Sequence, residues 1–145
     1  YGYTMCYRYT HDQKYLDMAE KIYNFIFNNP NLPEDLVPYW DFDAPGIPNE
    51  PRDASAAAVM ACAMYELSMY NPEKAALYKK WADTIVESLS KNYRAQLDGD
   101  RGFLLLHSTG AHNFERDVPL VYADYYFLEA LLKKAKLEKE GTAIL

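Results

Sequence analysis

The sequence predicts an all-α protein in which about five helices form antiparallel hairpins. Apolar residues recur at the i, i+3, i+4, i+7 spacing of amphipathic helices, and no alternating strand pattern competes with them. A second observation is an internal repeat, because Ala19 and Ile22 recur as Ala82 and Ile85 at an offset of 63 residues. One helical hairpin per repeat predicts a closed or stacked array of hairpins.

The first two helices are expected at residues 1–9 and from about residue 13 to about residue 28. The first is rich in aromatic residues and has no capping residue ahead of it. The run Thr10-His-Asp-Gln13 is typical of a reciprocal capping box at the start of the second helix. Pro30 blocks continuation of that helix.

The third helix is expected from about Ala54 to Met69, the fourth from Asn71, and the fifth from about Leu120 to Leu137. Its alanine-rich sequence gives the third helix almost no polar face, and the fifth begins nearly all apolar. We therefore expect the first, third and fifth helices to be buried, and the second and fourth to be one-sided. Cys6 and Cys62 lie in apolar stretches and are expected to be buried free thiols.

Connection lengths alternate in the same way as the helices. Short connections follow the buried helices, whereas long loops, 29–53 and 92–119, lead back to the next buried helix. Loops of that length inside a compact domain are usually functional. Because both arrive at N-terminal ends of buried helices, we expect them to share one end of the array and to form a binding cleft there, where helix dipoles favour anions.

Composition excludes some partners and leaves others open. The 145 residues carry a net charge of −6, which argues against a nucleic-acid partner, and no apolar run is long enough to cross a membrane. No signal peptide is visible, and the compartment stays open between bacterial periplasm and cytoplasm.

The chain opens at Tyr1 within a helical pattern. We therefore expect a truncated start, with residues 1–145 forming a single domain segment.

The first long loop supplies five candidate substrate contacts. Trp40 beside Asp41 offers a stacking face next to a carboxylate, a combination suited to sugars, although Trp40 could equally anchor the loop. Arg52 could pair with a substrate carboxylate, or with Asp41, Asp43 or Glu50. Asp53 or Ser55 fits the N-cap of the third helix.

The second long loop and the helix after it supply four more candidates. His107, Ser108 and His112 could contact sugar hydroxyls, and the spacing of the two histidines is not one typical of zinc. Asp124 lies in the first turn of an apolar helix, so it either ties down a loop or faces the cleft. No catalytic carboxylate pair, metal site or cofactor site is assigned from the residues.

Three segments resemble glycoside hydrolase family 88, the unsaturated glucuronyl hydrolases. They are Trp40-Asp-Phe42, Arg52-Asp-Ala-Ser-Ala-Ala-Ala58 and Tyr122-Ala-Asp-Tyr-Tyr-Phe-Leu-Glu-Ala-Leu131. The opening Tyr1-Gly-Tyr-Thr4 is similar to the segment after that family's Arg-Gly-Gln-Ala-Trp stretch. The resemblance covers nearly the whole chain but only the C-terminal third of such an enzyme. Ala123 stands where many relatives have Gly.

The resemblance implies that the chain is part of an (α/α)6 toroid. It also implies hydrolysis of unsaturated uronate-containing oligosaccharides: an aspartic acid protonates C4 of the 4,5-unsaturated uronic acid, water adds at C5, and the hemiketal collapses. The catalytic aspartates are expected upstream of Tyr1, in a missing N-terminal part of the same enzyme. Alternatives are an unsaturated rhamnogalacturonyl hydrolase, a sugar epimerase, or a non-catalytic helical-repeat binding module, which the two long loops disfavour.

Overall fold

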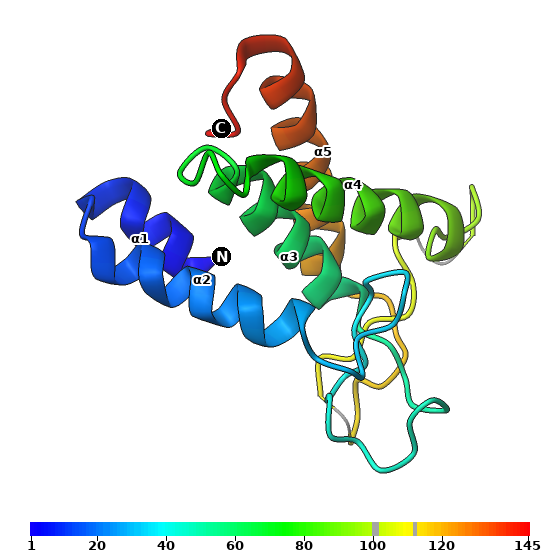
Figure 1. Cartoon of the computed structure of the whole chain (residues 1–145). Coiled ribbons are helices and arrows are strands. Elements are labelled where there is room, and N and C mark those ends of the chain that lie inside the picture. Colours follow the sequence, from blue (N-terminus) through cyan, green and yellow to red (C-terminus); the bar gives the residue numbers. More distant parts are fainter. Residues whose placement is uncertain (100–101, 112) are drawn as a thin grey trace.

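The computed structural model describes residues 1–99, 102–111 and 113–145, and its described residues form five helices and no extended strand. The helices are α1 (Gly2–Thr10), α2 (Gln13–Phe27), α3 (Ala54–Leu67), α4 (Ala75–Asn92) and α5 (Val121–Glu140). α1 and α2 form one hairpin, and α3 and α4 form a second (Figure 1). α5 packs along α3, which therefore lies between α4 and α5. The all-α prediction is confirmed, with about the expected helices.

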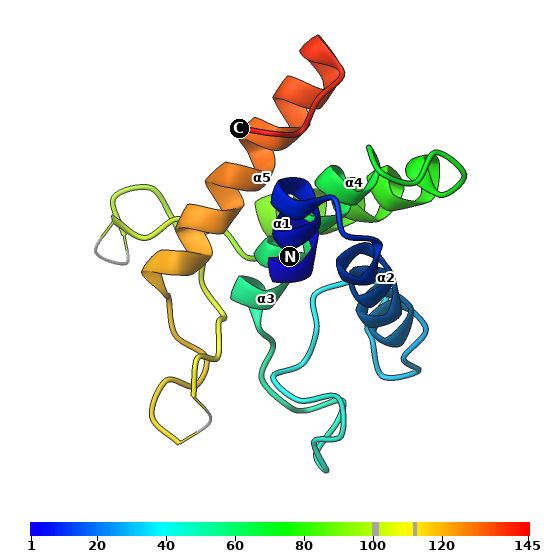
Figure 2. The ribbon, with the colours of Figure 1, turned by 90° about the vertical axis from the view of Figure 1, so that its left-hand side faces the viewer.

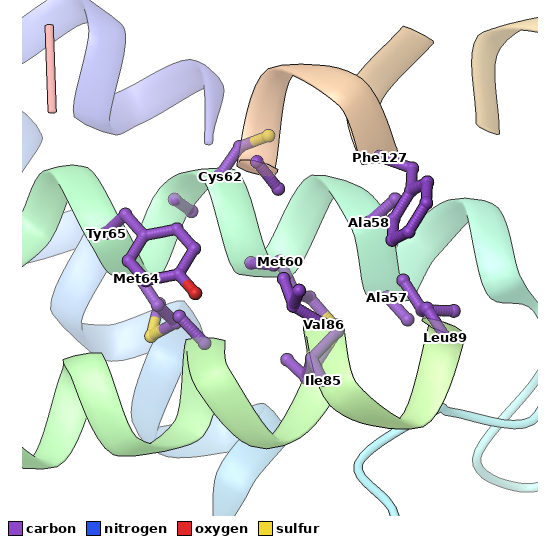
Figure 3. Close-up of a cluster of buried hydrophobic side chains, with 14 of the residues drawn as sticks. Ala57, Ala58, Met60, Cys62, Met64, Tyr65, Ile85, Val86, Leu89 and Phe127 are labelled. Carbon is purple, nitrogen blue, oxygen red and sulfur yellow. The ribbon is translucent and has the colours of Figure 1, made fainter. Parts of the chain in front are cut away.

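α3 is the centre of the core, as its alanine-rich sequence predicts. Ala57 and Ala58 are fully buried, and Figure 3 shows them opposite Leu89 of α4 and Phe127 of α5. Since an alanine face adds little bulk, helix axes can approach closely. The apolar spacing of α4 predicts a buried stripe at Ala75, Tyr78, Ala82, Ile85 and Leu89, and all of these except the half-buried Ala75 are buried.

Aromatic side chains join the two hairpins. The rings of Phe27 on α2 and Trp81 on α4 are stacked, with centroids 4.1 Å apart and planes 6° apart. Tyr23 meets Tyr78 edge to face at 4.5 Å. The Tyr78 hydroxyl also donates to Glu20, which accepts from Lys74 as well. Large side chains thus hold α2 and α4 together.

Two local predictions at helix starts are wrong. Asp12, rather than Thr10, caps α2, because its carboxylate accepts the Lys14 N–H at 3.1 Å, while Gln13 bonds Asp17 instead of reaching back. α4 begins at Ala75, since the Asn71 side chain accepts from the Lys74 N–H and closes a turn ahead of the helix. At α2 the predicted and observed caps are two neighbouring side chains, whereas at α4 the Asn71 side chain makes the bond of a cap and only the helix start differs.

α1 and α5 are not buried all round, contrary to the prediction. Thr4 is the buried residue of α1, whereas Tyr3, Cys6 and Tyr9 are exposed. Apolar composition alone does not predict which faces of a helix have neighbours.

The prediction of a buried thiol is wrong for Cys6 and confirmed for Cys62, where burial raises the pKa of the thiol. No helix of the described part of the chain could span a membrane.

A buried ion cluster joins α1, α3 and α5. Glu66 and Lys133 are both fully buried, with Lys133 Nζ 3.0 Å from Glu66 Oε2. Arg8 approaches the same oxygen at 3.2 Å. Lys133 also donates to the carbonyl of Ala143, which fixes the segment after α5. This cluster fastens three helices and the C-terminal segment around Glu66, and Glu129 of α5 adds a second carboxylate 3.6 Å from Lys133 Nζ.

Candidate functional site

The two long loops meet at one end of the helices, as the sequence analysis predicts. Both views show the first loop (cyan) and the second loop (yellow) at the same end as the start of α3 (Figures 1 and 2). The Ala54 N–H donates to the His107 carbonyl at 3.0 Å, and the Thr109 hydroxyl donates to the Arg52 carbonyl at 3.1 Å. The second loop therefore supplies an acceptor for the first N–H of α3.

A cleft of about 570 Å³ begins at this end and runs along α3 between the two hairpins as far as Leu67, with the first loop as its end wall. No described residue of the second loop lines it, so the prediction that both long loops form the cleft is wrong for the second loop. The cleft walls are mostly apolar and aromatic, and the loop wall carries carboxylates. Four of the predicted site residues line the cleft: Trp40, Asp41, Asp53 and Ser55. Arg52, His107, Ser108 and Asp124 do not line it.

Trp40 and Asp41 form the loop wall of the cleft. Trp40 is half-buried, and its indole N–H donates to Glu50 Oε2 at 2.9 Å. This bond orients the ring, so that anchoring and stacking are compatible roles for one side chain. Asp41 is exposed and accepts the Asp43 N–H at 2.9 Å. An aromatic face beside carboxylate acceptors suits the C–H face and hydroxyl groups of a sugar.

Asp53 caps α3, which decides between the two candidates left open by the sequence. Its carboxylate accepts the Ser55 N–H at 3.0 Å and the Ser55 hydroxyl at 2.5 Å. It also accepts the Thr109 N–H at 3.4 Å from the second loop. Asp53 thus joins the helix start, the cleft wall and the second loop.

Arg52 ties two parts of the first loop to each other. The guanidinium donates to the Asp35 carboxylate, and its Nε–H donates to the Val37 carbonyl at 2.9 Å. Asp35 accepts from the Tyr93 hydroxyl at 2.9 Å as well. The ion-pair alternative is therefore the arrangement observed, but with a different partner from those expected. Sequence reasoning missed Asp35 because nothing in its local pattern marks a contact 17 residues away.

The second loop presents a histidine–aspartate pair that the sequence analysis did not connect. His107 Nδ1 lies 2.8 Å from Asp117 Oδ1, and both side chains are about half exposed. Both residues have left-handed backbone conformations, with φ of 64° and 55°. Such conformations are uncommon outside glycine and often occur where a side chain must be aimed. The backbone pairing of Ser108 with Val118 holds the two residues opposite each other.

The structure describes Ser108 but not His112. Ser108 is fully buried, and its hydroxyl has no hydrogen-bond partner among the described residues. His112 lies outside the described residues. No cluster of metal-binding side chains occurs in the described ranges.

Asp124 ties down the second loop, one of the two roles left open by the sequence. Its two carboxylate oxygens accept the N–H groups of Leu104 and Leu105, each at 2.9 Å. It also occupies the first turn of α5, where the helix dipole stabilises a negative charge. The carboxylate thereby fixes the loop against the start of α5.

Solved structures define the class of fold to which these helices belong. The structure superposes with a TM-score of 0.91 on an unsaturated glucuronyl hydrolase described as specific for heparin, at 46% identity, over 96% of this chain and 38% of that one. The unsaturated glucuronyl hydrolase of Bacillus sp. GL1 gives a TM-score of 0.85 at 28% identity, over 99% of this chain and 38% of that one. The five helices therefore have the α/α-toroid fold of the unsaturated glucuronyl hydrolases, as predicted.

Sequence comparison leads to the same kind of enzyme, so the predicted resemblance to the unsaturated glucuronyl hydrolases is confirmed. The chain is 48% identical to one from Formosa agariphila over 94% of its own length and 34% of the relative. It is 30% identical to an unsaturated chondroitin disaccharide hydrolase of Streptococcus pneumoniae, over 92% of its own length and 34% of the relative. The chain spans about one third of the length of the curated relatives that it matches. No family model matches it.

Proposed function

We propose that residues 1–145 are one segment, the C-terminal part, of an enzyme that removes 4,5-unsaturated uronic acid from oligosaccharides produced by polysaccharide lyases. The observation that carries this proposal is the match to unsaturated glucuronyl hydrolases along 96% of the chain at a TM-score of 0.91. Two related structures are described as complexes with unsaturated saccharides, dGlcA-Glc-Rha-Glc and dGlcA-GalNAc6S. An unsaturated uronate at the end of a short chain is therefore the proposed substrate class.

The proposed reaction is hydration of a vinyl ether. An aspartic acid gives its proton to C4, a water adds its oxygen to C5 and returns a proton to the aspartate carboxylate, and the hemiketal opens to release the neighbouring sugar. The aspartates that act in this step are proposed to lie outside residues 1–145, in the rest of the enzyme. None of the carboxylates described above is given that role.

The role proposed for this segment is contact with the saccharide at the loop end. Trp40 would stack on a sugar ring, while Asp41, Asp53 and Ser55 would meet its hydroxyl groups. Three carboxylates, of Asp41, Asp43 and Asp53, line the cleft. A cleft wall of that charge suits neutral parts of the substrate better than its uronate.

Further contacts are proposed on the second loop and beside it. The His107 ring is half-exposed, and its Nδ1 contacts Asp117. Its Nε2 therefore remains to contact a sugar hydroxyl. Ser108, His112, Arg52 and Asp124 remain proposed contacts of the intact enzyme. For Arg52 and Asp124, the contacts described above already provide a structural role.

Trp40 provides the test of this role. We consider a chimera in which this chain replaces the matching third of the Formosa agariphila relative. In it, Trp40→Ala is expected to raise KM for an unsaturated glucuronyl disaccharide about tenfold, because an aromatic face is lost. Trp40→Phe keeps a ring but loses the bond to Glu50, and is expected to raise KM much less.

Phe114→Ala is the matched control, since Phe114 is an exposed aromatic residue of the second loop that does not line the cleft. Its KM is expected to stay unchanged. An unaltered KM for Trp40→Ala would show that the residue only anchors its loop. Equal effects of Trp40→Ala and Trp40→Phe would assign the effect to the Glu50 bond.

A further inference from the structure

Tyr93, the residue that follows α4, donates a hydrogen bond from its hydroxyl to Asp35 in the first loop. The Tyr93 hydroxyl lies 2.9 Å from Asp35 Oδ2, and the Ser88 hydroxyl approaches the same oxygen at 3.4 Å. The other carboxylate oxygen accepts from the Arg52 guanidinium. Burial raises the pKa of Tyr93 above its ordinary value, so the hydroxyl keeps its proton and remains a donor. One carboxylate therefore connects the end of α4 with two parts of the first loop.

On the side of the first loop, the Asp35 carboxylate reaches two residues of the cleft wall through Arg52. Arg52 pairs with Tyr39 in an isolated antiparallel bridge, and its guanidinium carbon lies 4.9 Å from the centre of the Tyr39 ring. The N–H groups of Trp40 and Asp53 donate across the same pairing to main-chain carbonyls, at 3.1 and 2.8 Å. Trp40 and Asp53 directly follow the two bridged residues and line the cleft. A displacement of Arg52 is therefore passed on to both.

On the side of the second loop, Tyr93 contacts His107. The Leu106 N–H donates to the Tyr93 carbonyl at 2.9 Å, and the rings of Tyr93 and His107 meet edge to face with centroids 6.0 Å apart. The His107 carbonyl in turn accepts the Ala54 N–H at the start of α3. The position of His107 thus depends on both the main chain and the ring of Tyr93.

We propose that Asp35 and Tyr93 are positioning residues for saccharide binding, which set Trp40 of the first loop and His107 of the second loop relative to each other. This inference rests on the proposed function, in which those two loops contact the saccharide. Neither Asp35 nor Tyr93 lines the cleft, and Tyr93 is buried. Their effect on binding therefore passes through the residues that they hold, and a contact displaced by a fraction of an ångström loses much of its effect.

Tyr93→Phe in the chimera tests this proposal, because it removes the hydroxyl and keeps the ring. KM for the unsaturated glucuronyl disaccharide is expected to rise about fivefold with kcat unchanged, since contacts to the saccharide move while the reacting groups do not.

Tyr65→Phe is the matched control. The buried Tyr65 also donates its hydroxyl to an aspartate, Asp83 at 2.7 Å, near the end of α3 that is farther from the two loops. The control is expected to lose a similar amount of stability and to keep its KM. Equal KM values for Tyr93→Phe and Tyr65→Phe would overturn the proposal, because Tyr93 would then serve stability alone.

A second comparison asks whether Tyr93 acts through the two contacts. In a chimera that already carries Trp40→Ala and His107→Ala, Tyr93→Phe is expected to change KM by less than about twofold, since the side chains to be positioned are gone. A general effect on structure would raise KM equally in both backgrounds, and that result would also overturn the proposal.

Fluorine NMR of the 145-residue chain tests the positioning without any activity. The chain has two tryptophans, Trp40 and Trp81, so labelling with 5-fluorotryptophan gives one resonance for each. Tyr93→Phe is expected to shift the Trp40 resonance, whereas Tyr65→Phe leaves it in place. An unmoved Trp40 resonance in Tyr93→Phe would contradict this proposal and leave the proposed function standing. A shifted resonance together with a folded but inactive chimera would support the positioning and contradict the proposed function.

Discussion

Lys133→Met is expected to lower the free energy of unfolding by about 3 kcal/mol, the low end of the usual cost of removing one partner of a buried ion pair, because Arg8 still contacts Glu66. Lys133 and Glu66 are both fully buried, and the ammonium group is 3.0 Å from the carboxylate. Methionine preserves much of the side-chain volume, so the loss comes from the charge and from the hydrogen bond to the Ala143 carbonyl. Urea unfolding followed by circular dichroism measures the effect.

Two controls separate the buried pair from a general effect of losing a lysine. Lys139→Met changes an exposed lysine in the last turn of the same helix and is expected to be nearly neutral. The double variant Lys133→Met/Glu66→Gln removes both charges and is expected to recover part of the lost stability. A loss of under about 1 kcal/mol for Lys133→Met would mean that the cluster is not a buried ion pair.

Asp124→Asn is expected to cost about 2–3 kcal/mol, because a carboxylate that accepts two backbone N–H groups becomes an amide with one oxygen. The amide nitrogen would then face the N–H of Leu104 or Leu105, two donors in contact. The favourable charge in the first turn of α5 is lost as well. Faster limited proteolysis within 92–119 is expected to accompany the loss of stability.

Asp98→Asn is the control for this prediction. Asp98 is exposed in the same loop and has a φ of 63°, a conformation that asparagine tolerates well. Stability and proteolysis are expected to stay unchanged. If Asp124→Asn behaved like Asp98→Asn, the carboxylate would not be what fixes the second loop.

Features set by local spacing were predictable from the sequence. The buried stripe of α4, the all-round burial of α3 and the meeting of both long loops at one end follow from periodicity and from connection lengths. These features depend on residues that are near one another along the chain. They also place Trp40, Asp41, Asp53 and Ser55 at the cleft.

Features set by contacts between distant residues were not predictable in this way. The pairing of Arg52 with Asp35 and of His107 with Asp117 depends on how each loop folds back on itself. The exposure of α1 has a different cause. Its aromatic residues are typical of a buried helix, but the described part of the chain supplies neighbours on one side only.

The most direct test of the proposed function is hydrolysis of an unsaturated glucuronyl disaccharide, followed by the loss of ultraviolet absorbance of its double bond. We expect the chimera to turn the substrate over and the 145-residue chain alone to be inactive, because the catalytic aspartates are placed outside it. Turnover by the chain alone, or a folded chimera that leaves the absorbance unchanged, would contradict this account.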